Sequence, residues 1–333
     1  MLKKGLLIAA IASVAFAGNV KMDLNAKYGA TNFHTKGAVE FSSLVKDYSN
    51  GSVDITVHAG SSLVKGNPLK AVKDGTVAMT DMFIPFTSGG GKVFGISALP
   101  FIASSYDDAF KLYQISKPAY EKTAKKWNQK FLYSVTWPAS GFYSSKKMTS
   151  FKDFKGVKTR TYDKNSASFV NSAGGNAVAL PWGEVYSSLR TGMVNSVITS
   201  SASGKDGKFW EVLSNFTKIK YAFPLQAVTI NLDYWNAMDK AQQDAVLKAA
   251  KQIEKKQWDA VRVEDKTAQE IMSKNGMKID EASPMLQKQL GVIANNMLVK
   301  YLDGANSQIK GIFDEYISTA SPEVKKVFEK YRK

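Results

Sequence analysis

Short β-type runs alternate with amphipathic helical stretches at the start of this chain, and this order constrains the fold more than any other feature. Phe41 and Val45 share one face of the first helical stretch, while Val53 and Ile55 point to one side of the next strand. The order βαβαβ predicts a parallel sheet with helices on both faces. The expected elements are strands at 20–28, 53–58 and 77–83, and helices at 35–47 and 67–73.

The same alternation restarts after Phe151 and predicts a second α/β unit. From Asp239 to about Gly276 the periodic pattern predicts one long helix, which we expect to brace both units. No low-complexity linker separates the units, so we expect the chain to cross between them in strands that form a hinge. The elements of the second unit are strands at 157–161, 177–180 and 194–199, and helices at 164–173 and 184–191.

These patterns predict an α/β protein with two lobes, a cleft between them and a long bracing helix. We assign residues 18–143 and about 225–265 to the first lobe. Residues 144–224 and about 266–333 are assigned to the second lobe.

Residues 1–17 have the composition of an export signal. Lys3 and Lys4 precede an apolar run at 6–12, and Ala15 and Ala17 fit the small-residue cleavage pattern. The run is too short to span a bilayer. The alternative, a core helix of a cytosolic protein, is disfavoured by the basic flank and the cleavage pattern. We therefore expect a signal peptide and a soluble, periplasmic protein.

The composition excludes several kinds of site. The chain has no cysteine and two histidines, which leaves no thiolate chemistry, no disulfide and no histidine-rich zinc site. The formal net charge is +16, but the lysines are scattered along amphipathic helices, as is typical of solvated faces. No nucleic-acid motif appears. We expect no metal, no cofactor and no nucleic-acid partner, and a positive field that steers an anionic ligand.

Catalytic motifs are also absent from the sequence. There is no GxSxG, phosphate loop, dinucleotide fingerprint or HExxH, and the carboxylates have no evident partner for acid–base chemistry. An enzyme is therefore disfavoured. A cleft between two lobes that is lined with aromatic residues is typical of ligand binding.

Arg160 is the main candidate for contacting a ligand. It ends a short β-type run, where loops change direction, and its planar fork suits a carboxylate. The alternative is a surface arginine in a salt bridge. The spacing alone leaves both interpretations open.

The arrangement of short motifs resembles the extracytoplasmic substrate-binding subunits of TRAP transporters, the DctP-type family. Residues 154–160 read FKGVKTR, similar to the family pattern DLKGxKxR, and 181–192 read PWGEVYSSLRTG, similar to PxxExYxALxxG. Residues 71–75, AVKDG, and 99–101, LPF, match motifs of the family's first lobe. Each match is weak alone, but their order and spacing are specific.

The resemblance implies a mechanism. Two lobes close around an organic acid like a flytrap, and Arg160 matches the arginine that pairs with the ligand carboxylate. Trp182 matches an aromatic residue that packs against the ligand. The loaded protein is expected to dock on the small and large membrane subunits of a permease driven by an ion gradient.

Two positions depart from the family pattern and bear on specificity. Tyr143 stands where many members carry a second arginine, and Thr199 stands where the family has asparagine. Both changes favour a small monocarboxylate, including an aromatic one, over a dicarboxylate. Trp137, Phe33 and His34 are further candidates for contact with the ligand, although core packing is the alternative for Trp137 and a solvated loop for His34.

Three other functions remain open on the sequence alone. The first is the same transport role with a dicarboxylate or a sulfonate, which would need another donor from the first lobe. The second is an exported enzyme that acts on an organic acid. The third is a binding protein that serves a chemoreceptor instead of a permease.

Overall fold

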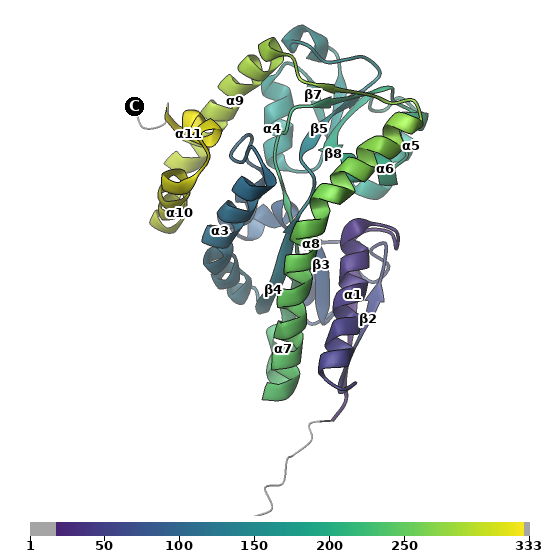
Figure 1. The fold of residues 1–333 in the computed structure, drawn as a ribbon, viewed down its shortest axis with the longest axis vertical. Helices are drawn as coiled ribbons and strands as arrows, with labels where there is room; N and C mark the ends of the chain where they lie inside the picture. The colour runs from purple at the N-terminus through teal and green to yellow at the C-terminus, as the bar shows by residue number, and fades with distance from the viewer. Residues whose placement is uncertain (1–17, 330–333) are drawn as a thin grey trace, which may run out of the picture.

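The computed structural model describes residues 18–329. The predicted signal peptide at 1–17 lies outside the described residues. The chain forms two mixed sheets with helices around them, and one long helix runs along both (Figure 1). The predicted α/β class with a long bracing helix is confirmed.

The first sheet has the strand order β2-β1-β3-β10-β4, in which β1 pairs in parallel with β2 and β3, and β10 is antiparallel to β3 and β4. The predicted βαβαβ unit is therefore present. The elements of this lobe up to β4 are β1 (Val20–Ala26), α1 (Phe33–Tyr48), β2 (Val53–His58), α2 (Pro68–Lys73), β3 (Met79–Phe83), the 3-10 helices η1 (Ile84–Gly90) and η2 (Lys92–Ala98), α3 (Tyr106–Lys126) and β4 (Gln129–Thr136). Later in the chain it gains β10 (Leu225–Asn231) and α7 (Leu232–Ala237).

The second sheet has the strand order β11-β9-β5-β8-β6-β7. Strands β6, β7 and β8 run parallel to one another, whereas β5 is antiparallel to β8 and β9. The elements of this lobe are β5 (Ser140–Ser144), η3 (Phe151–Phe154), β6 (Lys158–Thr161), α4 (Lys164–Ser172), β7 (Asn176–Ala179), η4 (Trp182–Glu184), α5 (Val185–Arg190), β8 (Ser196–Ser200), α6 (Ser201–Asp206), η5 (Phe209–Glu211), β9 (Asn215–Lys218) and β11 (Lys278–Glu281).

Helix α8 (Lys240–Lys274) is the predicted long helix. It begins at a capping box, in which Asp239 accepts from the Gln242 amide and Gln242 accepts from the Asp239 amide. Its 35 residues span about 52 Å, long enough to contact α1 and β4 in the first lobe and α6 and β11 in the second. The helix therefore braces both lobes.

The C-terminal helices divide between the lobes differently from the prediction. The first half of α9 (Pro284–Asp303) buries Leu286 and Leu290 in the second core, whereas its second half buries Leu298 in the first. Helices α10 (Ser307–Thr319) and α11 (Pro322–Glu329) also pack on the first core, beside α3 (Figure 1). We predicted that residues 266–333 belong to the second lobe, whereas the second half of α9, α10 and α11 pack on the first core.

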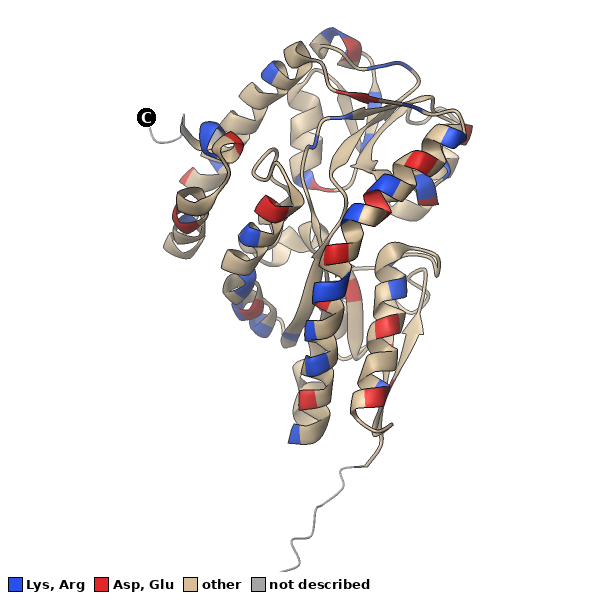
Figure 2. Cartoon of the chain, viewed as in Figure 1, with Lys and Arg blue, Asp and Glu red and all other residues tan. Residues whose placement is uncertain are grey.

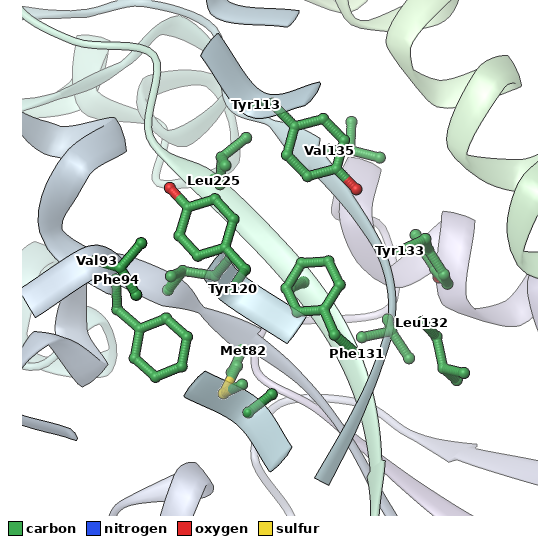
Figure 3. Packing of buried hydrophobic residues seen from close by; sticks show 14 of the residues in the cluster. Met82, Val93, Phe94, Tyr113, Tyr120, Phe131, Leu132, Tyr133, Val135 and Leu225 are labelled. Carbon is green, nitrogen blue, oxygen red and sulfur yellow. The ribbon is translucent and has the colours of Figure 1, made fainter. Parts of the chain in front are cut away.

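The core of the first lobe is dense in aromatic residues. Tyr120 of α3 stacks on Phe131 of β4 with ring centroids 5.9 Å apart, and Leu225 lies close by (Figure 3). Each such buried side chain stabilises the fold by about 1.5–3 kcal/mol relative to an exposed one. This packing holds β4 at the edge of the first sheet, and from the end of β4 the chain crosses to the second lobe.

Two short segments cross between the lobes next to each other. One joins β4 to β5 and the other joins β9 to β10, and they are hydrogen-bonded together. The Trp137 amide donates to the Pro224 carbonyl oxygen at 2.8 Å, and the Ser140 amide donates to that of Ala222 at 3.0 Å. We expected the chain to cross in strands, but the crossing segments, 137–139 and 219–224, belong to no strand and only connect strands of the two sheets. Strand β5 belongs to the second sheet, so the first lobe ends earlier than the predicted residue 143.

The charged residues are spread over the helices. Positively and negatively charged residues alternate along α8 (Figure 2). Lys255, for example, pairs with Asp259 one turn away. Exposed pairs of this kind contribute little to stability. Among the described residues, no helix has the length and apolar character needed to cross a membrane.

Candidate ligand-binding site

A cavity of about 470 Å³ lies between the lobes, and both sheets and the crossing segments contribute to its wall. Lys27 follows β1 and Phe83 ends β3 in the first lobe. Arg160 lies in β6 and Thr199 in β8 of the second. In open α/β sheets, ligands bind outside the carboxyl ends of the strands, and these residues lie at such ends.

Arg160 is buried in the wall of the cavity, with 5% of its surface exposed. Its Nε and Nη2 atoms both donate to the carbonyl oxygen of Leu180, each at 3.1 Å. Leu180 directly follows β7, which pairs in parallel with β6. The neighbouring strand therefore fixes the plane of the guanidinium, and three of its five N–H groups remain for other partners.

The charge of Arg160 has no counter-ion among residues 18–329, since no carboxylate there lies within ion-pair distance of it. The surface salt bridge that the sequence also allowed is therefore not formed. Burial lowers the pKa of Arg160 to about 10, so the group stays protonated at neutral pH. A buried cation without a partner is costly, and an anion that enters the cavity relieves this cost.

Aromatic side chains form the adjoining walls. Trp137, Trp182 and Tyr28 all line the cavity. The ring of Tyr28 lies 4.8 Å from that of Trp137 and 6.2 Å from that of Trp182, centroid to centroid, both in edge-on contact. Because Tyr28 belongs to the first lobe and Trp182 to the second, the contact between these two rings joins the lobes across the cleft.

Small polar groups complete the lining. Thr199 lines the cavity and is 5% exposed. The Ser140 and Tyr162 hydroxyls also line it and lie 3.3 Å apart. These hydroxyls can accept from or donate to the polar parts of a ligand.

Tyr143 is not among the residues that line the cavity. It points to the opposite face of β5 from Ser140, because side chains alternate along a strand. The ring stacks on Phe216 at 4.3 Å, and the hydroxyl donates to the Ser200 carbonyl oxygen at 3.0 Å. The structure therefore places Tyr143 in the core of the second lobe.

Phe33 and His34 also lie outside the lining. They begin α1, and the His34 ring packs behind Trp137 with centroids 4.3 Å apart. Burial lowers the pKa of His34 to about 3, so the ring is neutral. His34 therefore supports a wall of the cavity from behind and offers no charge to an anion.

The structure thus brings Arg160, Trp182, Thr199 and Trp137 together at one cavity and leaves Tyr143, His34 and Phe33 behind its walls. Several lining residues were not predicted. They share one feature that could have identified them in the sequence, namely a position at or just after the carboxyl end of a strand. These residues are Lys27, Tyr28, Phe83, Tyr162 and Asp163.

No group of three or more His, Asp or Glu side chains suited to a metal ion occurs within residues 18–329. The polar groups at the cavity are instead one buried guanidinium, hydroxyls and lysines, with Asp163 as the carboxylate. A cavity lined mainly by cations and hydroxyl donors is suited to binding an anion.

The sequence model of the DctP family, bacterial extracellular solute-binding proteins of family 7, matches residues 25–302. The chain belongs to this family. Among curated sequences, a solute-binding protein of Albidiferax ferrireducens is 26% identical over 285 residues, which cover 81% of this chain and 83% of that protein.

Two solved structures are similar over almost the whole length. A TRAP solute-binding protein from an unidentified marine microbe, specific for pyroglutamate, has 31% identity and a TM-score of 0.87, covering 91% of this chain and 100% of that one. The Bordetella pertussis receptor DctP6, which binds pyroglutamic acid, has 30% identity and a TM-score of 0.87, covering 90% and 100%.

The family membership sets the general role. The protein is a TRAP solute-binding protein that acts outside the cytoplasm, and its family consists of solute receptors and not of enzymes.

Proposed function

We propose that this DctP-family protein captures a small monocarboxylate in the cleft, with Arg160 bound to the carboxylate, and delivers it to TRAP membrane subunits. The observation that carries the proposal is the buried Arg160, which has no carboxylate partner among the described residues and presents free N–H groups to the cavity. A ligand carboxylate supplies the missing charge in a bidentate or charge-assisted contact.

Pyroglutamate is the leading candidate for the ligand. Both solved structures of 30% identity or more described above bind it, and it carries a single carboxylate on a small ring. Trp137, Trp182 and Tyr28 offer faces against which such a ring packs. Thr199 and the Ser140–Tyr162 pair offer hydroxyls for its amide.

Isothermal titration calorimetry of pyroglutamate with Arg160→Ala tests this proposal. Loss of one partner of a buried charge pair costs about 3–5 kcal/mol, so we expect the dissociation constant to rise by at least about 100-fold. Arg190→Ala is the matched control, because Arg190 is exposed on α5 of the same lobe. Unchanged affinity in Arg160→Ala contradicts the assignment.

A dicarboxylate or a sulfonate is the second candidate class. It is favoured by the lysines at the cavity, because Lys27, Lys65 and Lys164 line it as well as Arg160. Titration of succinate and of a small sulfonate beside pyroglutamate separates the classes. Tighter binding of succinate than of pyroglutamate would favour the dicarboxylate.

Delivery to a permease is the second half of the proposal. Uptake of labelled pyroglutamate into proteoliposomes that contain the two TRAP membrane subunits should require this protein and an ion gradient. Uptake that does not depend on the added protein would instead favour a role such as serving a chemoreceptor.

A further inference from the structure

Lys27 is the half-buried lysine that the first lobe contributes to the cavity wall. It directly follows β1, next to Tyr28. Lys65 and Lys164 also line the cavity, but both are exposed. Solvent screens the charges of those two lysines far more than that of Lys27.

The Lys27 ammonium has no counter-ion among residues 18–329, since no ion pair includes it. Its nitrogen lies 5.2 Å from the ring centre of Phe86, an exposed residue at the mouth of the cavity. Burial, followed by the charge of Arg160, lowers the pKa of Lys27. Two cations, one from each lobe, therefore repel each other across the same space.

Asp81 is the carboxyl group that attracts Lys27, but it does not line the cavity. It lies in β3, 3% exposed, and its Oδ2 atom has no hydrogen-bond partner. Burial raises the pKa of Asp81 to about 7, so at neutral pH it carries only part of a charge. Asp163 lines the cavity and attracts Arg160, and burial raises its pKa to about 6. Neither Asp81 nor Asp163 forms an ion pair with Lys27 or Arg160, so both cations lack a direct ion-pair partner among the described residues.

We propose that Lys27 is a second anchor for the carboxylate that Arg160 binds, so that one anion is held from both lobes at once. This inference rests on the proposed function, because it needs an acidic ligand at Arg160. A carboxylate has two oxygens and about four acceptor positions, enough for a guanidinium on one side and an ammonium on the other. A ligand carboxylate that contacts both cations also holds the cleft closed, because Lys27 belongs to the first lobe and Arg160 to the second.

Calorimetry with Lys27→Met tests the proposal, with pyroglutamate and its neutral amide as probes. We expect Lys27→Met to weaken binding of pyroglutamate by about 10-fold or more and to leave binding of the amide within about twofold. Lys27→Arg keeps the charge and should retain most of the affinity. Lys21→Met is the matched control, because Lys21 is an exposed lysine of the same strand, β1, and does not line the cavity.

Two results would overturn the role of Lys27. One is pyroglutamate affinity in Lys27→Met within about twofold of wild type. The other is an equal loss for the acid and the amide, which indicates that the side chain only supports the fold. If Arg160→Ala loses affinity and Lys27→Met does not, the proposed function stands and only the second anchor fails. Failure of the wild type to bind pyroglutamate, succinate or the sulfonate contradicts both.

Discussion

At the scale of single residues, the cavity is marked by a buried cation, Arg160, that has no direct ion-pair partner among the described residues. Arg160 is held by the carbonyl oxygen of Leu180, which accepts two hydrogen bonds but carries no full charge. The protein therefore bears the cost of desolvating a cation before the ligand arrives. In return, the guanidinium does not need to reorganise when a carboxylate enters.

Asp81 makes a testable contribution to the pH dependence of stability. Its pKa is about 7 in the folded protein, against an ordinary value of 3.8, so the folded state keeps a proton that the unfolded state has released. The free energy of unfolding therefore falls as the pH rises from about 4 to 7, by up to about 4 kcal/mol for this group. In Asp81→Asn this fall should be smaller.

Urea unfolding at pH 4.5 and pH 7.5 measures the effect. Asp47→Asn is the control, because Asp47 is exposed on α1. If Asp81→Asn and wild type lose the same free energy between the two pH values, Asp81 does not hold its proton in the folded state.

Part of the cavity lining could be predicted from the sequence, and the reason lies in the positions of the strand ends. Arg160 and Thr199 were recognised because short motifs mark the ends of β6 and β8. Tyr143 was predicted to contact the ligand but packs in the second core, because a motif does not show to which face of β5 the side chain points. Lys27 carries no motif, and its position just after the carboxyl end of β1, the strand that pairs with β3, brings it to the cavity.

At the scale of secondary structure elements, one residue joins the start of α1 to the other lobe. The Asn32 side chain accepts from the His34 amide at 2.9 Å, which caps α1. Its Nδ2 atom donates to Asp206 Oδ2 at 2.7 Å, at the end of α6 in the second lobe. A hydrogen bond to a charged group contributes about 1.5–3 kcal/mol, so this contact favours the closed cleft.

Asn32→Asp separates these two roles. An aspartate keeps the cap, but it removes the donor and sets a carboxylate against Asp206. We expect the protein to stay folded and to release pyroglutamate about 10-fold faster or more, as measured by stopped-flow fluorescence of the cleft tryptophans. Asn306→Asp is the control, since Asn306 caps α10 and makes no such contact with the other lobe. Equal release rates in both variants would show that Asn32 does not hold the lobes together.

The long elements were the most predictable ones. Helix α8 follows from its capping residue Asp239 and an apolar stripe that is continuous over many turns. The lobe to which α10 and α11 belong could not be predicted, because an amphipathic pattern gives the buried face but not the partner that covers it.

At the scale of the whole molecule, the two lobes share two crossing segments, a long bracing helix and a cavity. The hydrogen-bonded segments at Trp137 and Ala222 carry the chain across, and α8 contacts both sheets. The edge-on contact of Tyr28 with Trp182 joins the lobes beside the cavity. Closure by hinge motion around a ligand excludes water and strengthens the charge pairing inside.

The most direct test of the account is a crystal structure of the protein purified from its native periplasm, with whatever ligand it retains. We predict a small acid in the cavity, with a carboxylate oxygen within hydrogen-bond distance of the free Arg160 N–H groups and its body between Trp137 and Trp182. A ligand that places no acidic group at Arg160, or that binds outside this cavity, would contradict the central claim.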